Sequence, residues 1–107
     1  MEQIVFAQEL KKEGLRLFHE GLYEEAAAKF GQAQEAFTAE GNEVEAAEVL
    51  NNLGVVYRMQ GKWDEAIAAL EEARATFARL GDRSREAQAL GNLGQGQPCP
   101  LAGPAKE

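Results

Sequence analysis

The sequence repeats itself with a period of 40 residues, and this repeat limits the possible folds more than any other feature. Three positions recur three times, and they are Ala7/Ala47/Ala87, Leu10/Leu50/Leu90 and Gly14/Gly54/Gly94. Many further pairs share the same offset, among them Gly21/Gly61, Ala26/Ala66, Asn52/Asn92, Phe37/Phe77 and Gly41/Gly81. Self-similarity at a period of about 20–50 residues is typical of a solenoid, in which each unit packs only on its neighbours. The sequence therefore predicts a stack of similar units.

Within each unit, apolar residues follow helical spacing on both sides of a glycine. Leu50, Leu53 and Tyr57 recur at intervals of three and four residues before Gly61. A second apolar stripe follows Gly61 and consists of Trp63, Ala66, Ile67, Leu70, Ala73 and Phe77. Two amphipathic helices joined by a short glycine turn pack as an antiparallel pair. One unit is therefore predicted to be a pair of helices.

Applied to the whole chain, the pattern predicts an all-α, right-handed solenoid of five helices. The predicted helices lie near residues 3–20, 22–40, 43–60, 63–80 and 83–95. They form two complete repeats, at about 3–41 and 43–81, and the first helix of a third repeat, within one domain of residues 1–95. Residues 96–107 contain all three prolines and no apolar periodicity, so we expect a disordered tail there.

The second unit resembles a tetratricopeptide repeat. That family has the pattern W-x2-L-G-x2-Y followed by A-x3-F. Leu50-x2-Leu53-Gly54-x2-Tyr57 and Ala66-x3-Leu70 fill most of it, with Leu50 in place of the Trp and Leu70 in place of the Phe. The 40-residue unit is longer than the usual ~34 residues and resembles the repeats of kinesin light chains and of G-protein-regulating spindle scaffolds. The resemblance implies a non-catalytic protein–protein interaction module.

Composition disfavours several other classes of function. The net charge is −7, from 18 acidic and 11 basic residues, which argues against nucleic acid and anionic membranes as partners. His19, Ser84 and Cys99 are each the only residue of their type, so we expect no metal, no cofactor and no enzymatic site. No apolar run approaches the ~18 residues of a membrane span, and the N-terminus lacks the features of a secretory signal. We expect a cytoplasmic protein.

The family resemblance also implies a binding groove, because the first helix of each pair lines the concave face in such proteins. Counting from the aligned glycines places Leu15, Phe18 and His19 on that face. The candidate peptide-binding residues are Lys11, Asn51, Asn52, Val55, Arg58 and Asn92. Amides bond to peptide backbone and bases meet carboxylates, so the expected ligand is an extended, acidic segment. For Asn52 and Asn92, the alternative is a solvated surface amide.

The C-terminal helix suggests a second function. Ala87, Leu90 and Leu93 correspond to Ala47, Leu50 and Leu53, which belong to a complete pair. One side of this helix has the preceding helix to pack on, whereas the other side expects a sixth helix. The alternative reading is therefore a homo-oligomerising assembly module, a dimer formed through Ala87, Leu90 and Leu93. A monomer whose tail folds back over this face is the competing arrangement.

Overall fold

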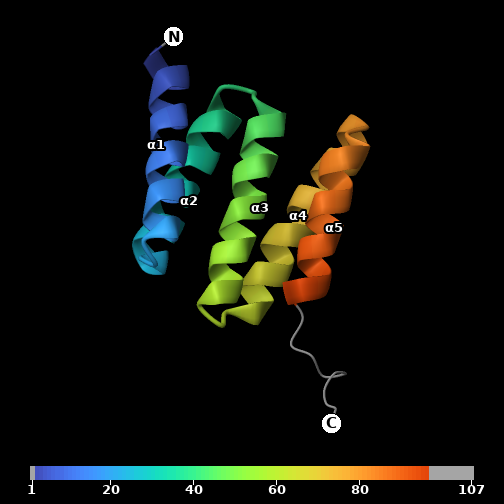
Figure 1. Cartoon of the computed structure of the whole chain (residues 1–107). Helices are drawn as coiled ribbons and strands as arrows, with labels where there is room; N and C mark the ends of the chain where they lie inside the picture. Colours follow the sequence, from blue (N-terminus) through green and yellow to red (C-terminus); the bar gives the residue numbers. More distant parts are fainter. Residues whose placement is uncertain (1, 97–107) are drawn as a thin grey trace.

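A computed structural model describes residues 2–96, with side chains described from Phe6 to Gly94. The regular secondary structure of this part of the chain is entirely helical, without a strand. The helices are α1 (Glu2–His19), α2 (Tyr23–Ala39), α3 (Glu43–Met59), α4 (Trp63–Leu80) and α5 (Arg83–Gly96) (Figure 1). Each predicted helix agrees with the observed one within one residue at both ends, so the prediction of an all-α repeat fold is confirmed. Of the predicted tail, Gly96 ends α5, and residues 97–107 lie outside the described residues.

Four glycines set the helix boundaries. Gly21, Gly41, Gly61 and Gly81 have φ between 76° and 80°, a left-handed conformation that side-chain-bearing residues avoid. After α1, the Gly21 N–H donates to the Phe18 carbonyl at 3.0 Å and the Leu22 N–H donates to the Leu17 carbonyl at 2.9 Å. The same pair of bonds recurs at the other three glycines. This Schellman geometry satisfies the last carbonyls of each helix and turns the chain back.

The helices α3 and α5 each begin with a side-chain cap of the same kind. Asn42 Oδ1 accepts a hydrogen bond from the Glu45 N–H at 3.3 Å, and Asp82 Oδ1 accepts one from the Arg85 N–H at 3.2 Å. Asn42 and Asp82 are 40 residues apart, so the cap belongs to the repeat. A cap of this kind stabilises a helix by ~1 kcal/mol. The residues that precede α2 and α4, Leu22 and Lys62, form no side-chain cap.

In each complete pair, the two helices approach closely where a glycine of the first helix faces a large apolar residue of the second. A Cβ on Gly14 would lie 2.7 Å from two ring carbons of Phe30, and a Cβ on Gly54 would lie 2.5 Å from Leu70 Cγ. Phe30 and Leu70 are fully buried and occupy the same position of the repeat. Only glycine lets the two backbones approach this closely, which explains the Leu-Gly of the second repeat's motif.

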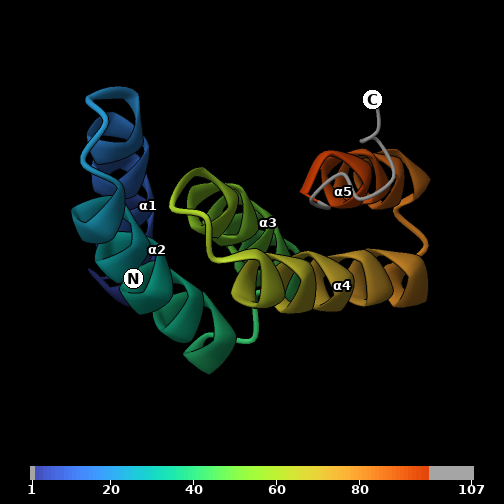
Figure 2. The same ribbon diagram turned by 90° about the horizontal axis from the view of Figure 1, so that it is seen from below.

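The helices form two rows. The first helices of the units, α1, α3 and α5, lie on one side, and α2 and α4 lie on the other (Figures 1 and 2). Each helix packs on the next in sequence, and α3 also contacts α5. In the described part of the chain, no helix has the length and apolar character needed to cross a membrane. The row of α1, α3 and α5 presents the face on which the sequence predicted a groove.

Candidate functional site

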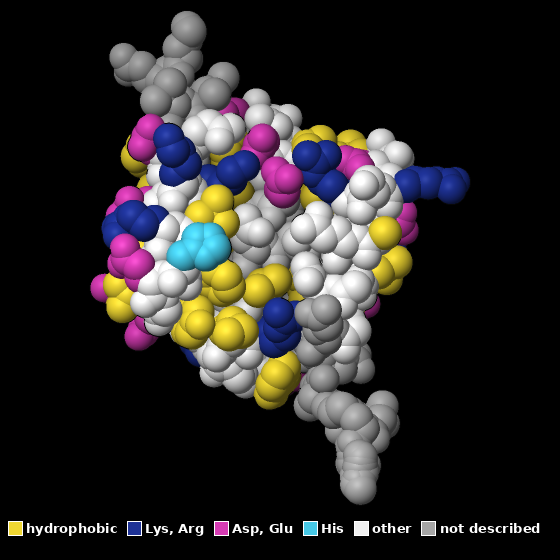
Figure 3. Space-filling view, in the orientation of Figure 1, with side chains coloured by type: hydrophobic (Ala, Val, Ile, Leu, Met, Phe, Trp, Pro, Cys, Tyr) yellow, Lys and Arg dark blue, Asp and Glu magenta, His cyan; other side chains and the backbone are white. Residues whose placement is uncertain are grey.

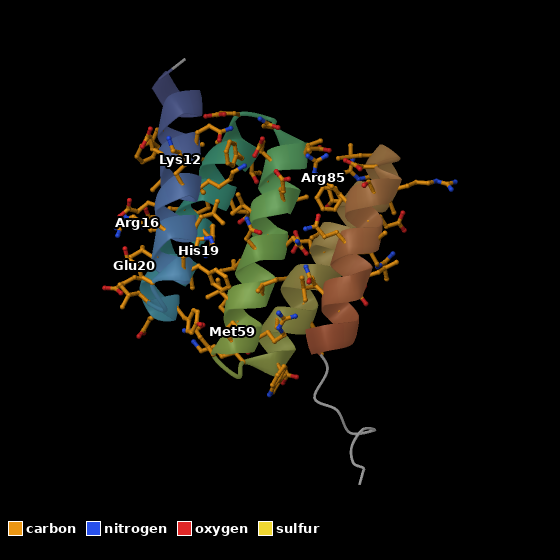
Figure 4. All side chains as sticks on the ribbon, viewed as in Figure 1. Lys12, Arg16, His19, Glu20, Met59 and Arg85 are labelled. Atoms are coloured by element: carbon orange, nitrogen blue, oxygen red, sulfur yellow. The ribbon has the colours of Figure 1, made fainter. Side chains whose placement is uncertain are left out.

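The α1/α3/α5 face has two chemically different parts. In Figure 3, which shows this face, charged side chains gather over its upper part and apolar side chains gather beside and below the histidine. Figure 4 shows Lys12 and Arg85 in the upper part and His19 and Met59 in the lower part. We call the first part the ion-pair cluster, formed by Lys11, Glu45, Glu48, Asp82 and Arg85. We call the second part the apolar hollow, lined by Leu15, Phe18, His19, Phe30, Asn52 and Val55.

The ion-pair cluster joins three helices through Glu48. Lys11 Nζ lies 3.6 Å from Glu48 Oε1, and Arg85 Nε donates to Glu48 Oε2 at 3.1 Å. Arg85 also pairs with Asp82 at 2.8 Å. Hydrogen bonds from the Arg85 side chain and backbone N–H lower the pKa of the Asp82 carboxyl, and Asp82 and Glu48 in turn raise the pKa of Arg85. The cluster therefore links α1, α3 and α5 through side-chain ion pairs.

Lys11 has a different environment from the one expected of a ligand-binding base. Its ammonium lies 2.8 Å from Glu45 Oε1 as well as near Glu48, and its side chain is 19% exposed. The cluster contains two cations and three carboxylates, so it does not attract an acidic segment. This corrects the expectation that Lys11 offers an open positive charge. The sequence interpretation missed Glu45, which is 34 residues away from Lys11.

Two of the predicted groove amides bond to each other. Asn51 is 4% exposed, and its Oδ1 accepts a hydrogen bond from Asn92 Nδ2 at 3.1 Å. Asn51 therefore lies at the contact between α3 and α5, which corrects the expectation that it faces a ligand. Asn92 is partly buried at the edge of the same contact. Arg58, in the last turn of α3, is partly exposed.

The apolar hollow contains the other two predicted residues. Asn52 and Val55 of α3 line it opposite Leu15, Phe18 and His19 of α1, with Phe30 of α2 among its lining residues. Its volume is about 110 Å³. The Phe18 ring lies 5.7 Å from the His19 ring in an edge-on arrangement and 5.6 Å from the Tyr23 ring. Helical counting from Gly14 placed Leu15, Phe18 and His19 on this face, but the contribution of Phe30 could not be read from its position in a core stripe.

The predicted self-association residues divide between the two sides of α5. Ala87 is exposed and Leu90 is 50% exposed. Leu93 is only 8% exposed, which corrects its prediction as a residue of the open dimer face. The reason is helical geometry, because Leu93 lies four residues after the fully buried Ala89 and shares its side of the helix. Self-association itself stays a prediction.

The chemistry of the apolar hollow is set by apolar, amide and imidazole groups. Among the side chains that the structure describes, no group of three or more His, Cys, Asp or Glu is placed to hold a metal ion. The hollow offers apolar contact, one amide and one imidazole. This combination suits recognition of a side chain and its neighbouring peptide groups.

A comparison with protein families agrees with the repeat geometry. The model of the tetratricopeptide repeat matches residues 14–79 and again residues 45–97. The two matches overlap, as expected when successive units of one array are recognised. No curated protein matches the chain significantly. The likeness to the long repeats of kinesin light chains stays an interpretation of repeat length.

Proposed function

Because the chain belongs to the tetratricopeptide repeat family, whose repeats generally mediate protein–protein interaction, we propose that it binds a segment of a protein partner on the α1/α3/α5 face. An apolar side chain of that segment occupies the apolar hollow. The observation that carries this proposal is the hollow itself, an apolar recess that includes Asn52 and Val55 on the predicted face.

The size of the hollow favours a peptide side chain over a free small molecule. Its volume of about 110 Å³ is well below the ~300 Å³ at which small-molecule pockets begin. Leu15, Phe18 and Val55 provide apolar contact on the two facing helices. A single aliphatic or aromatic anchor in such a recess supplies much of the affinity of a peptide complex.

Asn52 supplies the polar part of the proposed contact. An asparagine amide both donates and accepts, so it matches the N–H and C=O of an extended backbone. Asn52 lies in the middle of α3, where asparagine has only modest helix propensity. Lys11, Arg58 and Asn92 remain candidate contacts on the same face in this proposal, and the pairing of Lys11 with Glu45 and Glu48 argues against an acidic ligand at Lys11.

Selection from a peptide library on the full chain tests this proposal. We expect the selected peptides to share one large apolar residue. Val55→Glu should weaken their binding at least ~tenfold, because it introduces a charge beside a buried apolar group, and Asn52→Ala should have a smaller effect. Ala28→Glu, which adds the same charge on an exposed position of α2, is the matched control. The proposal would be contradicted if the peptides bound the Val55→Glu variant with the same affinity as the wild type while circular dichroism showed intact helicity.

A further inference from the structure

The C-terminal end of the array carries a second recess, which we call the terminal seat. It is lined by Ala78, Gly81, Arg83, Glu86, Ala87 and Leu90. An inner recess is lined by the residues 40 positions earlier, which are Thr38, Gly41, Glu43, Ala46, Ala47 and Leu50. The correspondence covers every lining residue of the terminal seat. The two recesses are therefore the same structural feature in successive repeats.

The difference between the two recesses is the helix that covers the inner one. Glu72, Thr76 and Arg79 of α4 also line the inner recess, whose volume is about 180 Å³. The terminal seat is open, with a volume of about 570 Å³. Leu50 is 9% exposed under its cover, whereas Leu90 is 50% exposed. Within the described residues, the terminal seat lacks the helix that its equivalent has.

Residues 97–107 are unsuited to supply this helix. The helices α2 and α4, which occupy the equivalent place, have 17 and 18 residues. The segment 97–107 has proline at positions 98, 100 and 104, and none of the Ala-x3-Leu/Phe spacing of those two helices. Proline in a helix interior removes a backbone hydrogen bond and clashes with the preceding turn. The sequence of this segment therefore does not match that of the helix that covers the inner recess.

The charges at the two recesses indicate the sign of the charged side chain that a helix in the terminal seat would carry. Over the inner recess, Arg79 of α4 pairs with Glu43 at 3.0 Å. The residue equivalent to Glu43 in the terminal seat is Arg83, so the charge at this position is reversed. A helix that pairs with Arg83 needs an acidic residue where α4 has Arg79. A second copy that inserted its α2 or α4 would not offer one, because both helices already bury their apolar sides within their own fold and α4 would place Arg79 against Arg83.

We propose that the terminal seat binds an amphipathic helix of another polypeptide. This helix repeats the apolar spacing of α4, which is Ala66, Leu70, Ala73 and Phe77, and carries an acidic residue two positions after the last of them. The large residue equivalent to Leu70 lies over Gly94, where an added Cβ meets nothing within 4 Å in the described part of the chain. This site is separate from the apolar hollow, and its occupancy does not depend on the proposed function of the α1/α3/α5 face.

Two synthetic peptides test the proposal against the full chain. The first has the sequence of residues 63–80 with Arg79→Glu, and the second has the unchanged sequence of residues 63–80. We expect the glutamate peptide to bind the wild-type chain about three- to tenfold more tightly, because it exchanges a repulsion for an ion pair at a surface site. In the variant Arg83→Glu the preference should reverse, and both preferences should shrink as salt is added.

The apolar part of the seat provides the controls. Leu90→Lys should abolish binding of the glutamate peptide, whereas Leu22→Lys, at a leucine of similar exposure (43%) in the α1–α2 turn, should leave it unchanged. Circular dichroism shows whether each variant is folded. The proposal is overturned if neither peptide binds or if Leu90→Lys retains full affinity. It is also overturned if the wild-type chain sediments as a dimer that Leu90→Lys converts to a monomer, because a second copy then occupies the seat.

Discussion

Gly54 and Gly94 occupy the same position in successive repeats but have opposite surroundings. An added Cβ on Gly54 would lie 2.5 Å from Leu70 Cγ and 3.3 Å from the Ala66 carbonyl oxygen. The same atom on Gly94 would meet nothing within 4 Å in the described residues. The inner pair of helices therefore needs glycine, and the terminal helix retains it although nothing packs against it among the described residues. A residue that recurs with the repeat therefore indicates which packing its position can accept, whether or not a partner is present.

The largest expected effect comes from truncating the leucine that faces Gly54, compared with truncating an exposed leucine of the terminal helix. Leu70 is fully buried against Gly54, so Leu70→Ala should lower the free energy of unfolding by about 2–5 kcal/mol. Leu90→Ala should lower it by less than ~1 kcal/mol, because half of that side chain is exposed. Urea denaturation followed by circular dichroism measures both values. Equal losses would mean that the terminal side of α5 is covered in solution.

A second test adds a methyl group at the two glycines and predicts opposite signs. Gly54→Ala should destabilise the fold by about 1–3 kcal/mol, since overpacking outweighs the gain in helix propensity. Gly94→Ala should stabilise it by up to ~1 kcal/mol, since only the propensity gain acts. The midpoints of urea denaturation, at unchanged slope, measure both effects. Combining Gly54→Ala with Leu70→Ala should cost less than the sum of the two changes, because the second removes the clash.

The sequence predicted the helices well because their boundaries are local. The left-handed glycines and the apolar spacing lie within one unit, so both could be read without knowing the packing between units. The contacts across the α1/α3/α5 face depend on how one repeat is rotated against the next. Lys11 contacts Glu45 over 34 residues, Arg85 contacts Glu48 over 37, and Asn92 contacts Asn51 over 41. A period of 40 identifies equivalent residues such as Asn52 and Asn92, but it does not identify the residues that touch.

A third test concerns the amide pair that joins the inner and terminal repeats. Asn51→Ala should lower the free energy of unfolding by about 1 kcal/mol, through loss of a partly buried hydrogen bond. The matched change Asn52→Ala, next to it but partly exposed, should have little effect on stability. A double-mutant cycle of Asn51 and Asn92 measures the coupling between the two amides. A coupling energy near zero would mean that the Asn51–Asn92 hydrogen bond does not stabilise the packing of α5 on α3.

The smallest expected effect separates the two equivalent helix starts by their response to acid. Asp82 caps α5 and pairs with Arg85, and these bonds hold the pKa of its carboxyl below its usual value. A carboxyl with a lowered pKa in the folded state contributes stability that is present above its unfolded pKa, near 3.9. That contribution is lost as the pH falls through the lower folded value.

The equivalent cap of α3 is Asn42, whose side-chain amide does not titrate in this range. Amide hydrogen exchange at the Arg85 N–H should therefore accelerate relative to exchange at the Glu45 N–H as the pH falls below ~4. Both rates are first corrected for the intrinsic pH dependence of exchange. Asp82→Asn keeps a capping amide oxygen but removes the charge. It should therefore lower the stability of the α5 start at pH 7 and abolish its additional loss in acid. Since the other carboxyls are common to both proteins, their titration cancels in the difference between wild type and Asp82→Asn. If that difference is the same at pH 7 and pH 3, the Asp82–Arg85 pair contributes nothing to the start of α5, and the two helix starts are equivalent in their energetics.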